Sequence, residues 1–169
     1  MAHSLILGMT QSGKTTLARR MVKDYSRKGI SCLILDPLKD PAWKKAGARY
    51  VTDDGEHFLT VVLRSQSCAI FVDESGEAIG RYARDLKALA TRSRHYGHNA
   101  HFLSQRAVDV DKTVRDQCAN LFCFRVSKKD AETLANEYGY EELLGCSVLD
   151  QGEFIACGRF KKPQRLRLF

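Results

Sequence analysis

The sequence has few of the features that mark a secreted, membrane-bound or disordered protein. It contains three prolines in 169 residues and no low-complexity linker. No apolar run approaches the roughly 18 residues that a membrane-spanning helix needs, so we expect a soluble protein. The six cysteines include no Cys-x-x-Cys pair. This spacing favours buried, reduced thiols in a cytosolic protein over a disulfide framework or a metal site.

The chain also has little room before its first motif, which begins at Gly8. Seven residues are too few for a signal peptide or a preceding domain. We therefore expect a single α/β domain over residues 1–169, a length that supports one independent core. The formal net charge of +7 suggests a polyanionic partner, although basic residues also serve solubility alone.

A complete phosphate-loop motif, G-x-x-x-x-G-K-[ST], occupies residues 8–15. Its glycines allow a tight turn that points successive backbone N–H groups at phosphates. Lys14 brings a positive charge to the outer phosphates, and the Thr15 hydroxyl can bind Mg²⁺. Helical spacing follows the loop, so the phosphates would also lie at a helix N-terminus. The predicted nucleotide-binding residues are Gly8, Met9, Thr10, Gln11, Ser12, Gly13, Lys14, Thr15 and Thr16.

Strand and helix signals alternate along the chain with short connections. This alternation predicts a mostly parallel sheet with helices on both faces. Strands are predicted at residues 4–7, 31–36, 48–52, 68–73, 100–104, 120–126, 153–157 and 166–169. Helices are predicted at residues 14–28, 55–64, 79–95, 110–119 and 128–138. The last two strands have no helical pattern between them, so we expect them to pair as an edge hairpin.

Two strand ends carry polar residues suited to phosphate chemistry. The apolar strand at residues 68–72 is followed by Asp73 and Glu74. In phosphate-loop enzymes an acid at this position holds Mg²⁺, which we assign to Asp73, and Glu74 can then polarise a water for attack on the γ-phosphate. Such a pair favours hydrolysis over a kinase reaction, which must exclude water. Gln105 would report loss of the γ-phosphate if its strand lies between the phosphate-loop strand and the acid-bearing strand.

Together these motifs resemble the FtsK/HerA superfamily of additional-strand phosphate-loop ATPases. The likeness rests on the phosphate loop, Asp36-Pro37, Asp73-Glu74, Gln105, and the segment 120–126 followed by a helix at 130–139. It implies a RecA-like core, ring assembly, ATP hydrolysis and translocation of double-stranded DNA. HerA proteins carry an N-terminal β-barrel, and FtsK and conjugation proteins carry membrane segments. Without these parts, the chain is similar to the compact genome-packaging ATPases of internal-membrane, tectivirus-type viruses.

The resemblance implies a Mg²⁺-dependent ATPase that packages a viral genome into a capsid. Its expected partners are double-stranded DNA, identical subunits in a hexameric ring, and capsid or membrane vertex proteins. Its expected location is the host cytoplasm or the virion. Two alternatives stay open: a small-molecule or nucleotide kinase, and an ATP-dependent assembly or secretion factor of a filamentous phage.

Basic residues could complete the site of a neighbouring subunit or contact DNA. In ring ATPases an arginine from one subunit can neutralise charge on the γ-phosphate in the next. Arg92, Arg94 and Arg115 are the candidates for this arginine finger, because the first two precede a glycine turn and the third precedes a strand. The basic segment 159–167 could bind DNA or capsid, or could serve solubility.

The histidines and the single tryptophan are interpreted as structural residues rather than as ligand-binding ones. His95, His98 and His101 are evenly spaced, but predicted turns separate them and no cysteine lies close in sequence. We therefore interpret them as surface turn residues rather than zinc ligands. Trp43 follows the second predicted strand and is expected to pack in the core rather than stack on a base.

Overall fold

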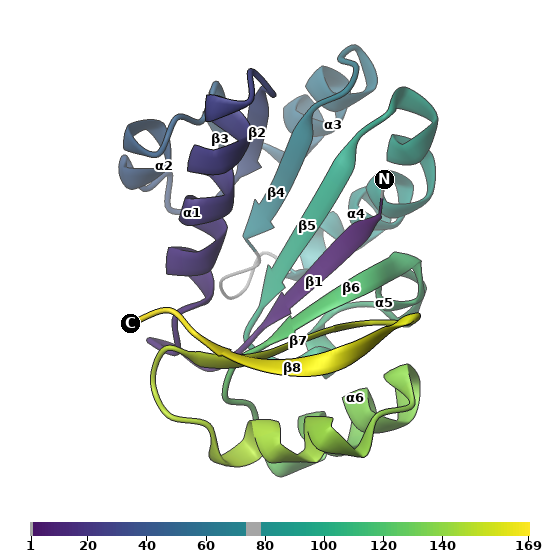
Figure 1. Cartoon of the computed structure of the whole chain (residues 1–169). Coiled ribbons are helices and arrows are strands. Elements are labelled where there is room, and N and C mark those ends of the chain that lie inside the picture. Colours follow the sequence, from purple (N-terminus) through teal and green to yellow (C-terminus); the bar gives the residue numbers. More distant parts are fainter. Residues whose placement is uncertain (1, 74–78) are drawn as a thin grey trace.

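The computed structural model describes residues 2–73 and 79–169, with side chains described outside residues 74–85. Its strands form one eight-stranded sheet in the order β3-β2-β4-β5-β1-β6-β7-β8 (Figure 1). The strands are β1 (His3–Leu7), β2 (Cys32–Leu35), β3 (Tyr50–Thr52), β4 (Ala69–Asp73), β5 (Asn99–Ser104), β6 (Cys118–Cys123), β7 (Glu153–Gly158) and β8 (Lys161–Arg167). Pairs among β1 to β6 are parallel, whereas β7 and β8 add antiparallel strands at one edge. The predicted α/β class and C-terminal edge hairpin are confirmed.

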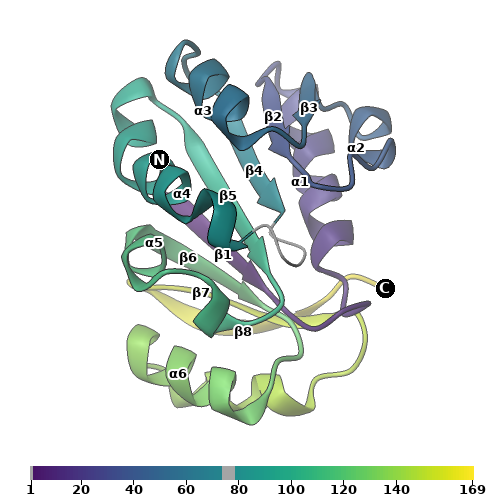
Figure 2. The same ribbon diagram turned by 180° about the vertical axis from the view of Figure 1, so that it is seen from behind.

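Helices cover both faces of this sheet. Helices α1 (Lys14–Arg27) and α2 (Ala42–Lys45) lie on one face, in front in Figure 1. The opposite face carries α3 (Gly55–Leu63), α4 (Ile79–Arg92), α5 (Lys112–Gln117) and α6 (Lys128–Tyr138), which lie in front in Figure 2. Short 3₁₀ helices η1 (Ser93–Tyr96), η2 (Ala107–Asp109) and η3 (Glu141–Val148) lie in the connections between helices and strands. In the described part of the chain, no helix combines the length and the apolar character that crossing a membrane requires.

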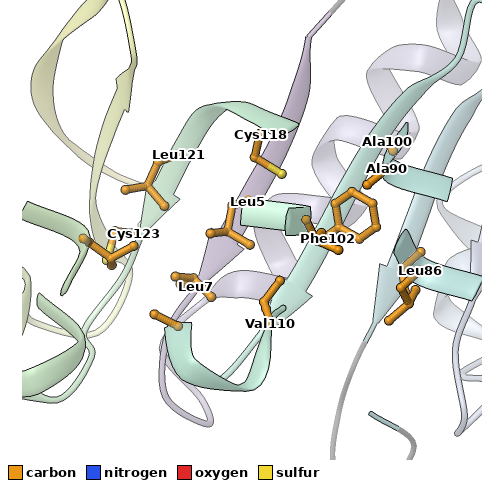
Figure 3. Packing of buried hydrophobic residues seen from close by; sticks show 14 of the residues in the cluster. Leu5, Leu7, Leu86, Ala90, Ala100, Phe102, Val110, Cys118, Leu121 and Cys123 are labelled. Carbon is orange, nitrogen blue, oxygen red and sulfur yellow. The ribbon is translucent and has the colours of Figure 1, made fainter. Parts of the chain in front are cut away.

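Two apolar clusters, one on each face, hold the helices to the sheet. In β1, Leu5 and Leu7 belong to the cluster under α3 to α6, while Ile6 belongs to the cluster under α1 and α2. Successive strand residues point to opposite faces, so a strand covered on both sides must be apolar throughout. Figure 3 shows Leu5 and Leu7 packed beside Phe102 and Leu121 of the neighbouring strands. This burial fixes β1, and with it the start of the phosphate loop.

Several predicted boundaries are wrong where the chain departs from regular periodicity. β8 begins at Lys161, five residues before the predicted strand at 166–169. Its first residues are basic and almost wholly exposed, so no alternation of apolar and polar residues marks them. The predicted helix at 110–119 is shorter because Asp111 caps α5 and β6 already begins at Cys118. The predicted helix at 79–95 ends at Arg92 and continues as η1.

Two of the three evenly spaced histidines lie in the interior, so the surface interpretation is wrong for them. His98 accepts a hydrogen bond from the Cys68 N–H at its Nδ1, and its Nε2 lies 3.0 Å from the Val62 carbonyl. His101 stacks on Phe71 at 4.5 Å, and burial lowers its pKa to about 3. Both are polar core residues, whereas His95 is exposed.

The six cysteines and Trp43 are also interior residues. All six thiols are free and buried, in agreement with the prediction of reduced core cysteines. Trp43 is fully buried against Phe71, so its predicted packing role is confirmed.

Candidate nucleotide site

The phosphate loop lies between β1 and α1 and is held by the two strands beside β1. The Gly8 N–H donates to the carbonyl of Ser104, the last residue of β5, and the Met9 N–H donates to the Arg125 carbonyl after β6. A Cβ on Gly8 would lie 2.6 Å from the Phe124 Cβ, so only glycine fits this close approach. Gly13 has φ of 119°, a conformation that L side chains rarely adopt. Both motif glycines are therefore required by the backbone path.

The N-terminus of α1 leaves its backbone donors available for a ligand. Gly13 is the N-cap and supplies no side-chain cap, and the first turn contains no acid. The first N–H groups of a helix have no partner within the helix and attract anions. In addition, the Ser12 Oγ is buried and has no hydrogen-bond partner among the described residues. The loop thus presents unsatisfied donors of the kind that phosphate oxygens accept from.

Six of the predicted site residues meet in one pocket of about 250 Å³ beside the loop. β5 lies between β1 and β4, as the interpretation of Gln105 required. The carboxyl ends of these parallel strands meet at one edge, and the pocket there is lined by Lys14, Thr15, Asp73 and Gln105 among others. Glu74, the predicted water-activating residue, lies outside the described residues.

The electrostatics of this pocket suit a cation. Burial, with a smaller contribution from the Asp36 carboxylate, raises the pKa of Asp73 to about 6, while Lys14 opposes the shift. Burial also lowers the pKa of Lys14, which Asp73 opposes. The Lys14 Nζ donates to the Met9 carbonyl at 3.3 Å, so it lies folded over the loop. A divalent cation beside Asp73 would relieve the repulsion between carboxylates, and the Thr15 hydroxyl in the same pocket is a suitable second ligand, so these residues fit Mg²⁺.

Three further charged residues line the pocket without having been assigned a role from the sequence. Asp36 is buried, and its carboxylate accepts hydrogen bonds from the Leu38 and Asp40 N–H groups and from the Trp43 indole. It therefore shapes the turn after β2. Arg19 forms an ion pair with Asp40, and its guanidinium lies 5.3 Å from the Trp43 ring centroid. Only the helical spacing of four between Thr15 and Arg19 could have indicated that Arg19 faces the site.

A second pocket, of about 700 Å³, lies on the other side of the loop. Residues 9–12 of the loop form one wall, and residues 125–128, which lead from β6 into the first residue of α6, form another. Ser147, Leu149, Asp150 and Gln151 complete it. The Gln151 Nε2 donates to the Gln11 carbonyl at 3.0 Å, which ties this wall to the loop. Thr10 and Gln11 line both pockets, so the loop separates two spaces that one elongated ligand could occupy together.

The candidate arginine fingers have different surroundings. Arg92 and Arg94 are exposed. They precede the start of β5, so they lie at the amino ends of the parallel strands, opposite the carboxyl ends that line the pocket. They could reach only the nucleotide of another subunit. Arg115 is buried; its guanidinium bonds Glu137 at 2.7 Å and also the Ala107 carbonyl. This placement argues against the prediction for Arg115, because its charge and donors are used within its own subunit.

Comparisons with known proteins agree with this architecture. The family described as "Helicase HerA, central domain" matches residues 1–106, and a search of curated proteins gives no match. The genome packaging NTPase B204 from Sulfolobus turreted icosahedral virus 2, in complex with AMPPCP, superimposes with a TM-score of 0.79 at 15% identity over 99% of this chain and 98% of that chain. B204, the DNA-packaging ATPase from Sulfolobus turreted icosahedral virus, gives 0.81 at 16% identity, with the same coverage.

A relative with another role has the same fold. The pCW3 conjugation coupling protein TcpA gives a TM-score of 0.74 at 16% identity, over 99% of this chain and 60% of that chain. At these identities the structural likeness establishes the fold, whereas the family match spans well over half of the chain. The chain belongs to the HerA central-domain family, within the FtsK/HerA superfamily of P-loop ATPases with a RecA-like core.

Proposed function

We propose that this protein hydrolyses ATP with Mg²⁺ and uses the energy to translocate double-stranded DNA, with packaging of a viral genome as its task. The observation that carries the proposal is the pocket in which Lys14, Thr15, Asp73 and Gln105 converge beside the phosphate loop. It contains a phosphate-binding cation, two oxygen ligands for a metal and a polar group at the end of the intervening strand. These are the parts that phosphoryl transfer to water requires.

The two pockets suggest how ATP lies across the loop. The β- and γ-phosphates would accept hydrogen bonds from the loop and from the first turn of α1, with Lys14 beside them. The nucleoside would then occupy the larger pocket, where Leu149 offers an apolar contact and Gln151 and Asp150 offer polar ones. The Ser12 Oγ would gain a partner that it lacks among the described residues.

Hydrolysis follows from the positions of the strand-end residues. Mg²⁺, held by the Thr15 hydroxyl and Asp73, would neutralise charge on the β- and γ-phosphates. Glu74, which directly follows β4, would accept a proton from the water that attacks the γ-phosphorus, and ADP leaves with the electron pair of the broken P–O bond. The Gln105 side chain is exposed at the pocket, so it can contact the γ-phosphate without displacing a buried group.

The site as described contains no cation placed to neutralise charge that develops on the far side of the γ-phosphate, apart from Lys14 and the paired Arg19. We therefore assign the missing cation to a neighbouring subunit in a hexameric ring. Arg92 and Arg94 are the candidates, because both are exposed at the edge opposite the pocket. A head-to-tail contact that joins opposite surfaces of identical subunits forms a ring when the rotation between successive subunits closes.

The DNA partner is supported by charge and by relatives. The net charge of +7 attracts a polyanion. B204 is described as a DNA-packaging ATPase, and TcpA as a conjugation coupling protein. We also propose that the protein acts in the host cytoplasm or at the virion, with capsid or membrane vertex proteins as further partners.

Measuring phosphate release with and without duplex DNA tests the proposal. We expect ATP hydrolysis that requires Mg²⁺ and rises at least severalfold when a long duplex is added. Hydrolysis that ignores DNA of any form would contradict translocation. Transfer of the γ-phosphate to a small acceptor, with hydrolysis suppressed, would instead establish a kinase. Stimulation by a membrane or coat protein and not by DNA would point to a phage assembly factor.

A further inference from the structure

The C-terminal strand β8 forms one edge of the sheet and is the most exposed strand of the described structure (Figure 1). Only Pro163 is partly buried; the other residues of β8 are exposed. The strand contains four basic residues and no acid. Exposure of a whole strand leaves its side chains free to contact another molecule.

Most of the positive charge on β8 has no internal partner. Arg165 bonds the Glu153 carboxylate at 2.6 Å. Within the described residues, Lys161, Lys162 and Arg167 form no ion pair. An anion that binds these three residues would therefore break no existing ion pair, although Glu153, which faces Arg167 in the β7–β8 pair, already attracts that guanidinium.

The edge is also unsuited to pairing with a further strand. Pro163 lacks a backbone N–H, and lysines on an edge strand disfavour pairing with another chain. Binding by added backbone hydrogen bonds is thereby disfavoured, and binding through charged side chains remains. The same edge that resists strand addition can receive a polyanion.

The spacing of the charges favours DNA over a small anion. A strand rises about 3.3 Å per residue, so the cations of β8 extend along roughly 20 Å. Each strand of duplex DNA presents one phosphate per about 3.4 Å of helix axis. Lys161 and Arg167 lie at the two ends of β8 and cannot converge on one phosphate group, but they can meet separate phosphates of one backbone.

The carboxyl end of β8 is connected to the phosphate loop by hydrogen bonds. The Leu168 N–H donates to the Gly152 carbonyl at 2.9 Å, and the Gly152 N–H donates to the Ser12 carbonyl at 3.0 Å. Arg20 of α1 donates to the Leu168 carbonyl at 3.1 Å. A shift of β8 would therefore act directly on the loop and on the helix that follows it.

We propose that β8 binds the phosphate backbone of duplex DNA and that the bonds at Leu168 transmit this contact to the phosphate loop. DNA binding at the edge strand then changes the position of the loop and raises the rate of hydrolysis. The inference rests on the proposed function as a DNA-translocating ATPase, and it names the element that meets the DNA.

The docking part is tested with two triple variants of equal charge change. Lys161→Gln/Lys162→Gln/Arg167→Gln alters β8, and Lys44→Gln/Lys45→Gln/Arg49→Gln removes three exposed charges near the opposite edge of the sheet. Binding of a labelled 30-base-pair duplex is measured by anisotropy across a salt series. We expect the β8 variant to bind at least about tenfold more weakly and to lose about 2.7 units of log-log salt slope, 0.9 for each lost phosphate contact. The control should change by less than about twofold.

The outcomes separate this inference from the proposed function. If the wild-type protein neither binds duplex DNA nor is stimulated by it, the proposed function itself fails. If the wild-type protein binds DNA and both variants weaken binding equally, or the β8 variant binds normally, β8 is not the docking strand. Binding of an acidic protein by β8, with normal DNA binding, would likewise overturn the inference.

The transmission part is tested by deleting residues 168–169, which removes the bonds at Leu168 and leaves the basic residues in place. The readout is the ratio of the hydrolysis rate with DNA to the rate without it, which does not depend on the fraction of folded protein. We expect DNA affinity within about threefold of wild type and a ratio close to one. A ratio equal to that of the wild-type protein would overturn transmission through Leu168.

Discussion

Replacing Asp73 with asparagine is expected to stabilise the nucleotide-free protein while it abolishes turnover. The pKa of this carboxyl is raised from 3.8 to about 6, chiefly by burial and then by the Asp36 carboxylate. Each pKa unit corresponds to about 1.4 kcal/mol, so holding the carboxylate ionised in the folded protein costs about 3 kcal/mol at neutral pH. Asparagine has nearly the same shape and does not ionise. It therefore removes this cost together with the proposed metal ligand.

The direction of the pKa shift determines how the stability contributed by Asp73 changes with pH. Because the pKa is higher in the folded state, the favourable contribution of Asp73 is complete below about pH 3.8 and is lost as the pH rises through about 6. Urea unfolding of both proteins at intervals from pH 4 to pH 8, without nucleotide or metal, measures the difference. The advantage of Asp73→Asn should grow from near zero to about 3 kcal/mol and then level off. Its Mg²⁺-dependent hydrolysis should fall by about a hundredfold or more.

Asp40 provides a control in the same pocket. Its pKa is lowered, first by the hydrogen bond from the Ala42 N–H and also by Arg19. The contribution of Asp40 is therefore fully present above about pH 3.8, so Asp40→Asn should be less stable than wild type by an amount that stays nearly constant from pH 5 to pH 8. A difference between Asp73→Asn and wild type that is constant with pH, or that shrinks as the pH rises, would refute the assignment of Asp73 as a buried, destabilising carboxylate.

Three more predictions follow from the same geometry. Lys14→Ala should abolish tight ATP binding, because the Lys14 charge contacts the phosphates of bound ATP. Glu74→Gln should retain binding and stop turnover, because the Glu74 carboxylate acts only as water attacks. Nucleotide titration measures binding, and phosphate release measures turnover. Mixing Glu74→Gln with whichever of Arg92→Ala and Arg94→Ala is inactive should restore part of the hydrolysis, since one mixed interface is intact; full activity of demonstrably monomeric protein would exclude a shared site. Burial lowers the pKa of His101 to about 3, so wild type should lose about 1.4 kcal/mol more than His101→Gln between pH 7.5 and pH 5.5 in urea unfolding, and an equal loss would contradict the buried neutral histidine.

The functional core of the site could be predicted from sequence because its determinants are local. The phosphate loop is recognised from eight contiguous residues, although a contact that requires glycine at position 8 comes from Phe124, far along the chain. Asp73 and Gln105 each follow an apolar strand, and parallel strands in a sheet covered on both faces bring such ends to one edge. Only the order of the strands remained to be supplied, and β5 does lie between β1 and β4.

The rest depended on contacts between residues that are distant in the chain. The sequence by itself determined an α/β P-loop protein with an acid, the predicted metal ligand Asp73, at the end of β4. The tertiary structure decided that Arg115 is neutralised by Glu137, that His101 is buried against Phe71, and that β8 begins at Lys161. The local sequence does not indicate whether a charged or polar side chain will be buried beside an interaction partner, because its burial depends on which elements pack over it. An exposed edge strand likewise lacks the apolar alternation by which a strand is identified in sequence, and it becomes a strand only because β7 offers it a ladder of hydrogen bonds.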